Sequence, residues 1–213
     1  MTETSYPSSQ LAHRRADMIP HAIGLALIIV AGGVLIAKSA ASLELRYVLA
    51  ISVYVGCALT SNIASWTYHF LPLHAQRKLL RRIDHAAIYP SIVGTFTPFF
   101  VQAGTTWTWF LLCLSWGLAG LAIWNKITNE TVQSRWSTAS YLGFGAIGLL
   151  ALPDLQAVPL ITFWCVVSGA GCYVVGTAFY VRRSMPFRYA LWHTWVNLGG
   201  ILMFIGIWYA YFH

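Results

Sequence analysis

The residues most able to do chemistry stand at regular spacing in three segments of the chain. Ser65 and His69 are four residues apart, Asp84 lies in the next segment, and Tyr189 and His193 are again four residues apart. Residues four apart share one face of a helix, so each pair can point to the same place. Imidazole and carboxylate groups bind zinc and transfer protons. The pattern therefore indicates that three helices present polar faces at one membrane depth.

The segments that hold these residues are long and apolar. Of the 213 residues, 58% are hydrophobic and only 9% are charged, against about 25% charged in an average soluble domain. Apolar runs of roughly 18 or more residues predict helices that span a bilayer. The sequence predicts an all-α integral membrane bundle of seven transmembrane helices, over residues 19–37, 47–70, 85–103, 106–124, 137–152, 157–181 and 189–212.

Lysine and arginine are concentrated in the loops of one side of this bundle. Eleven of the 13 fall in the N-terminal segment and in the second, fourth and sixth loops: Arg14, Arg15, Arg77, Lys78, Arg81, Arg82, Lys126, Arg135, Arg182, Arg183 and Arg188. Only Lys38 and Arg46 fall on the other side. Short cytoplasmic loops are enriched in these residues. We therefore expect a cytoplasmic N-terminal segment, residues 1–18, and a single transmembrane domain, residues 19–213, in the cell membrane, with the C-terminus outside. This topology accounts for the net charge of +7 without a nucleic acid partner.

Each candidate residue also has a purely structural interpretation. A histidine near a helix end can simply be hydrogen-bonded there, Asp84 can cap the start of the third helix, and Ser65 can bond to a backbone carbonyl. Six of the seven histidines, however, fall on the predicted cytoplasmic side: His13, His21, His69, His74, His85 and His193. Ionisable groups at membrane depth are costly and usually serve a site. We therefore expect a functional pocket at the cytoplasmic ends of the helices.

Several motifs resemble one known family over almost the whole chain. They are Ser-Trp-Thr-Tyr-His at residues 65–69, Arg-Ile-Asp-His-Ala-Ala-Ile-Tyr at 82–89, Gly-Thr-Phe-Thr-Pro at 94–98, Met-Pro-Phe-Arg-Tyr-Ala-Leu-Trp-His at 185–193 and Asp-Met-Ile-Pro-His-Ala-Ile-Gly at 17–24. With these motifs the chain resembles the hemolysin III branch of the progestin and adipoQ receptor (PAQR) family. The resemblance implies seven helices with a cytoplasmic N-terminus.

The resemblance also implies a zinc site near the cytoplasmic face. In the family, zinc is bound by one histidine of the second helix and by two histidines four residues apart on the seventh. An aspartate of the third helix and a serine of the second adjoin the metal. Carried over residue by residue, His69 and His193 would be metal ligands, and Asp84 and Ser65 would position the water as catalytic residues.

One ligand position departs from this family pattern. Tyr189 stands where the second histidine of the seventh helix is expected, and a neutral phenol is a poor zinc ligand at neutral pH. Asp84 or His21 could supply the third ligand instead. Alternatively, the pocket holds no metal and these side chains form a hydrogen-bond network.

Two functions follow from the resemblance. The first is a zinc-dependent hydrolase acting on a lipid amide, similar to ceramidases. The second is a non-enzymatic sensor of membrane lipids, or a regulator of membrane homeostasis, that uses no catalytic metal. Both predict membrane lipids as the partners of this protein.

Overall fold

A computed structural model describes residues 6–129 and 134–213 of the chain. These residues form seven α-helices and two short 3-10 helices, and no strand occurs among them. The helices are α1 (Leu11–Ser42), α2 (Leu45–Phe70), α3 (Arg77–Ala103), α4 (Thr106–Thr128), α5 (Ser134–Leu149), α6 (Leu160–Val181) and α7 (Arg188–Phe212); the 3-10 helices are η1 (His74–Gln76) and η2 (Leu152–Ala157). The predicted all-α bundle is confirmed.

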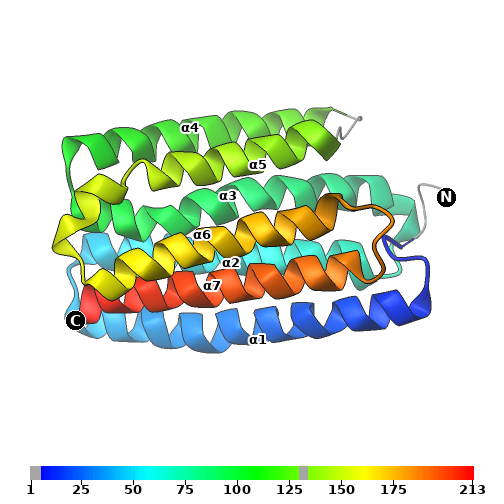
Figure 1. Cartoon of the computed structure of the whole chain (residues 1–213), viewed down its shortest axis with the longest axis horizontal. Coiled ribbons are helices and arrows are strands. Elements are labelled where there is room, and N and C mark those ends of the chain that lie inside the picture. The colour runs from blue at the N-terminus through cyan, green and yellow to red at the C-terminus, as the bar shows by residue number, and fades with distance from the viewer. Residues whose placement is uncertain (1–5, 130–133) are drawn as a thin grey trace.

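The helices lie side by side along the long axis of the molecule, and consecutive helices run in opposite directions (Figure 1). Helices α1, α2, α4, α6 and α7 are long and apolar enough to cross a membrane. Helix α5 has 16 residues, which span about 24 Å at 1.5 Å per residue, and η2 continues the chain beyond it. The two termini lie at opposite ends of the bundle (Figure 1), as an odd number of passes requires.

One end of the bundle carries most of the positive charge, and we call it the basic end. Helices α1, α3, α5 and α7 begin there, and α2, α4 and α6 end there (Figure 1). Helix α3 begins at Arg77, with Gln76 as its N-cap residue, so Asp84 lies two turns inside the helix and does not cap it. The side chain of Arg77 donates to the backbone carbonyls of Tyr68 and Leu71 at the end of α2. These bonds satisfy carbonyls that the helix end leaves unpaired, and they fix the start of α3 against α2.

Other helix boundaries differ from the sequence prediction by up to eight residues. Helix α1 begins at Leu11, eight residues before the apolar run, so Asp17 belongs to the helix. Helix α5 starts and ends three residues early, and α6 starts three residues late because η2 separates the two. Apolar runs predict the lipid-facing part of a helix, whereas the hydrogen-bonded helix extends into the polar interface.

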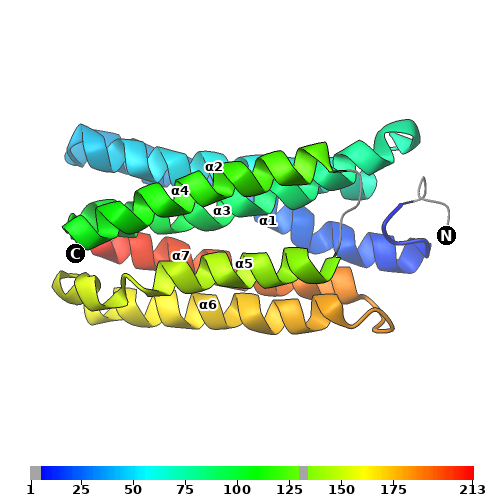
Figure 2. The same cartoon turned by 90° about the horizontal axis from the view of Figure 1, so that it is seen from above.

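Helix α3 lies inside the bundle and packs against α2, α4, α5 and α7 (Figure 2). Its buried residues Phe99 and Phe100 belong to two core clusters. The first cluster joins α1, α2, α3, α6 and α7 through Leu35, Ile51, Phe99, Val166, Met203 and Ile207. The second joins α4 to α3 through Phe96, Phe100, Leu111 and Leu112. The helices that carry the candidate residues are therefore held by a continuous apolar core.

Candidate metal centre

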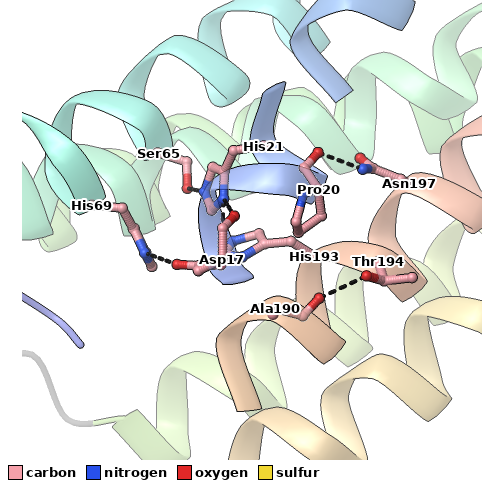
Figure 3. A network of polar contacts seen from close by, with 9 residues as sticks. All are labelled: Asp17, Pro20, His21, Ser65, His69, Ala190, His193, Thr194 and Asn197. Carbon is pink, nitrogen blue, oxygen red and sulfur yellow. Dashed lines mark hydrogen bonds and ion pairs between the residues drawn. The ribbon is translucent and has the colours of Figure 1, made fainter. Parts of the chain in front are cut away.

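Three histidines from three helices gather around Asp17 near the basic end (Figure 3). The Asp17 carboxylate is 1% exposed and accepts two hydrogen bonds, from Nδ1 of His69 at 2.7 Å and from Nδ1 of His193 at 2.8 Å. His21 follows Asp17 by one turn of α1, and its Nδ1 donates to the Asp17 backbone carbonyl at 2.8 Å. One residue of α1 thus orients an imidazole from each of α1, α2 and α7.

The hydrogen-bond partners determine which ring nitrogen carries the hydrogen. A carboxylate and a carbonyl can only accept, so Nδ1 is the protonated nitrogen in all three histidines. Each Nε2 is then left with a lone pair. Nε2 of His21 lies 3.0 Å from the Ser65 hydroxyl, which therefore donates to it. Histidines that bind metals commonly donate their other ring nitrogen to a carboxylate or a backbone carbonyl in this way.

The three imidazoles fit a metal ion. One nitrogen from each of His21, His69 and His193 lies within 4.8 Å of the others. Zinc binds histidine nitrogens at about 2.0–2.1 Å, which places tetrahedral ligands about 3.4 Å apart. Small side-chain movements would therefore close the set on an ion. A zinc ion held by three neutral imidazoles would have the ligand number of catalytic zinc sites, which bind three protein ligands.

The structure brings together the two histidines that the sequence singled out, His69 and His193, whose ring centroids are 5.2 Å apart. Of the two candidates for a third ligand, His21 belongs to the cluster and Asp84 does not. The ring of His21 is centred 3.8 Å from that of His193. The geometry therefore favours a set of three histidines over two histidines and a carboxylate.

Asp84 and Tyr189 lie beside the cluster. Asp84 lines the same cavity as Ser65 and the three histidines. The Tyr189 hydroxyl accepts from the guanidinium of Arg188 at 2.7 Å, and its ring packs edge-on against His69 at 5.3 Å. Tyr189 contributes a wall of the site and not a third nitrogen.

Asp17 is the central residue that the sequence analysis missed. It was assigned to the N-terminal segment because the apolar run begins two residues later. One signal could have found it, since Asp17 and His21 have the four-residue spacing that drew attention to Ser65 and His69. Both members of that pair are buried on one face of α1.

A close approach of helices holds α1 in place beside the cluster. Asn197, one turn after His193 on α7, donates to the Pro20 carbonyl at 2.7 Å (Figure 3). A Cβ atom added at Gly24 would lie 2.6 Å from Oδ1 of Asn197 and 3.0 Å from Oδ1 of Asn62. Only glycine at this position lets α1, α2 and α7 come so close. This contact fixes the position of His21 along the bundle axis relative to His193.

The cluster opens into a cavity of about 980 Å³ inside the bundle. Its wall near the basic end is largely polar and includes Ser65, Asp84 and the three histidines. Farther along the bundle the wall is apolar, with Ile92, Leu142, Leu149, Val174, Val196 and Met203. A cavity of this size, apolar at one end and polar at the other, suits a small amphipathic molecule.

Fold and site together define a helical membrane protein with a buried histidine–aspartate centre beside a large cavity. The family model of Haemolysin-III related proteins matches residues 11–204, and the chain belongs to this family. The Hemolysin-3 homolog of Bacillus subtilis (strain 168) is 32% identical over 191 residues, which cover 89% of this chain and 90% of that protein. Hemolysin-3 of Bacillus cereus is 30% identical over 207 residues, covering 96% and 94%. The resemblance to the hemolysin III branch is thus confirmed.

Proposed function

We propose that this protein is a zinc-dependent hydrolase that cleaves a lipid amide inside the membrane. The observation that supports the proposal is the cluster itself: three imidazoles from three helices, each with one nitrogen within 4.8 Å of the others, held by Asp17 in the wall of a large cavity. His21, His69 and His193 would hold the zinc ion, and Asp17 would keep their rings in place. A zinc ion held by three imidazoles supplies a Lewis acid that polarises a carbonyl group and lowers the pKa of water.

The roles of the neighbouring residues follow from their hydrogen-bonding groups. Asp84 accepts a proton from the attacking water and later donates a proton to the amine as the C–N bond breaks. Ser65 donates a hydrogen bond to the carbonyl oxygen as negative charge develops there. Water adds to the carbonyl carbon, and the products are a carboxylic acid and an amine. The apolar part of the cavity accommodates the acyl chain of the substrate.

The location proposed for this chemistry is the cytoplasmic side of the cell membrane. Among the described side chains, the basic end carries Arg14, Arg15, Arg77, Lys78, Arg81, Arg82, Lys126, Arg182, Arg183 and Arg188, and the opposite end carries Lys38 and Arg46. The side chain of Arg135 lies outside the described residues. By the positive-inside rule, this distribution supports a location of the cluster at the cytoplasmic ends of the helices.

Metal analysis combined with an activity assay tests the proposal. The purified protein should contain close to one zinc per chain and should release fatty acid from an N-acylated sphingoid base with a fluorescent acyl chain. His69→Ala should lose both zinc and activity, whereas Asp84→Asn should keep zinc and lose activity. His13→Ala is the control, because His13 lies on α1 but contacts Phe187 and not the cluster.

The outcomes separate the candidate functions. Zinc that stays bound in His69→Ala would refute the assigned site. Zinc binding without release of fatty acid from a panel of lipid amides would refute the hydrolase and favour the alternative, a non-enzymatic sensor of membrane lipids.

A further inference from the structure

A second polar site lies on α3, one residue beyond Asp84 and outside the metal cluster. His85 is 7% exposed, and its Nδ1 is buried without a hydrogen-bond partner. Its backbone carbonyl is occupied by the hydroxyl of Tyr141 at 2.8 Å, which ties α5 to α3 at this point. His85 lines the cavity. An unpaired polar atom in a buried position costs free energy, so a ligand group that bonds to this nitrogen would be stabilised.

Arg81 precedes His85 by one helical turn and lines the same cavity. Among the described residues, its guanidinium has neither a carboxylate partner nor a hydrogen-bond partner. Two cationic side chains, Arg81 and Lys126, act electrostatically on His85. The mouth of the cavity also includes Arg77, Arg82 and Arg188.

Negative charge that could balance these groups is scarce in the described part of the basic end. The described carboxylates there are Asp17, which accepts from His69 and His193, and Asp84, which lines the cavity together with five cationic side chains, Arg77, Lys78, Arg81, Arg82 and Arg188. Glu44 and Asp154 lie at the opposite end, in the connections after α1 and α5. The mouth of the cavity therefore carries an excess of positive charge on side chains that face its interior.

We infer that Arg81 and His85 form a binding site for the phosphate of an anionic membrane lipid. This inference goes beyond the proposed function, because the phospholipid is a ligand of the same cavity and carries no amide bond to be cleaved. Guanidinium groups bind phosphate oxygens through paired N–H donors, and the His85 nitrogen adds one further hydrogen bond. Basic pockets between transmembrane helices on the cytoplasmic side are a common form of phospholipid headgroup site.

The source of the phosphate follows from the shape of the cavity. It continues without interruption from Arg81 and His85 to the apolar wall formed by Leu142, Leu149 and Val174. A free phosphate ion would leave that apolar wall without a partner, whereas a phospholipid would place its acyl chains there.

Native mass spectrometry of the full-length protein in neutral detergent tests the site. The protein is titrated with phosphatidylglycerol, with phosphatidylcholine of the same acyl chains, and with phosphatidylglycerol in the presence of excess inorganic phosphate. All titrations contain a zinc chelator, so the result depends on neither metal nor turnover. The variants are Arg81→Gln and His85→Leu, with Arg81→Lys to restore the charge. Arg182→Gln is the matched control, because it removes the same charge at the same end from an exposed residue outside the cavity.

The native protein should prefer phosphatidylglycerol, and inorganic phosphate should not displace it. Arg81→Gln and His85→Leu should each raise the dissociation constant about tenfold, Arg81→Lys should recover part of the loss, and Arg182→Gln should change it less than about twofold. If His85→Leu fails to fold, the affinities of Arg81→Gln, Arg81→Lys and Arg182→Gln for phosphatidylglycerol are sufficient to test the site.

Equal affinity for the two lipids would overturn the inference, as would displacement by inorganic phosphate. An equal loss in Arg182→Gln would show diffuse surface attraction and overturn it too. The hydrolase proposal can fail independently of this inference. If the protein binds phosphatidylglycerol selectively but hydrolyses no lipid amide, the hydrolase proposal is refuted and the phosphate site is still supported.

Discussion

The carboxylate of Asp17 accepts a hydrogen bond from Nδ1 of His193 at 2.8 Å, although 176 positions separate the two residues in the chain. The same carboxylate accepts from His69 through its other oxygen. A buried carboxylate that bonds to two imidazoles from different helices fixes both rings and their tautomers. This relationship leads to the first prediction.

Asp17→Asn should weaken zinc binding by about 10- to 100-fold, the loss that removal of such a supporting partner typically causes. An amide has one acceptor oxygen, so it cannot accept from His69 and His193 as the carboxylate does. Competition with a fluorescent zinc chelator measures the affinity. Glu44→Gln is the control, because Glu44 is an exposed acid at the opposite end, paired with Arg46. An unchanged affinity in Asp17→Asn would mean that Asp17 does not support the ligands.

Tyr189→His should change zinc affinity by less than about tenfold, because His21 already supplies the third imidazole. The substitution should instead matter where His21 is absent. Position 189 is one turn before His193 on the same face of α7, so a histidine there can reach the cluster. His21→Ala should lose zinc, and His21→Ala combined with Tyr189→His should recover it. A large gain from Tyr189→His alone would show that the native site has only two nitrogen ligands.

Gly24→Ala should destabilise the protein by about 1–3 kcal/mol, as overpacking of a filled interior usually does. The added methyl group would meet Oδ1 of Asn197, which cannot retreat without losing the Asn197 bond to Pro20. Thermal unfolding in detergent measures the effect. Gly33→Ala is the matched control on the same helix, because no atom lies within 4 Å of a Cβ there. Equal melting temperatures for the two variants would contradict the close approach of α1 and α7.

The topology can be tested by fusing a reporter that is active only in the cytoplasm. A fusion after Arg183, in the connection between α6 and α7, should be active because basic connections are retained inside. A fusion after His213 should be inactive, since the C-terminus lies at the other end of the bundle (Figure 1). An active fusion at His213 would reverse the orientation proposed for the metal centre.

The sequence alone predicted the helices well because their lipid-facing surfaces are continuously apolar. It also indicated His69 and His193, because four-residue spacing shows which residues share a helix face. It did not reveal how the faces of different helices meet. That His21 and not Asp84 lies beside His69 and His193 depends on the close approach of α1 and α7, where Gly24 contacts Asn197. Similarly, hydropathy predicted that the third helix begins at residue 85, whereas α3 begins at Arg77. The Arg77 side chain bonds to backbone carbonyls at the end of α2, and hydropathy does not detect such bonds.

Asp17 also shows that a local sequence pattern does not reveal contacts between different helices. In the sequence it is an isolated acid before an apolar run, and in the structure it is 1% exposed between three helices. Its importance comes from partners on α2 and α7 that no local pattern connects to it.

X-ray absorption at the zinc edge of the purified protein tests the central claim most directly. The account predicts close to one zinc per chain, with three imidazole nitrogens at about 2.0–2.1 Å, and one imidazole fewer, or no zinc, in His21→Ala. A protein that takes up no zinc, or a zinc signal that His21→Ala leaves unchanged, would contradict it.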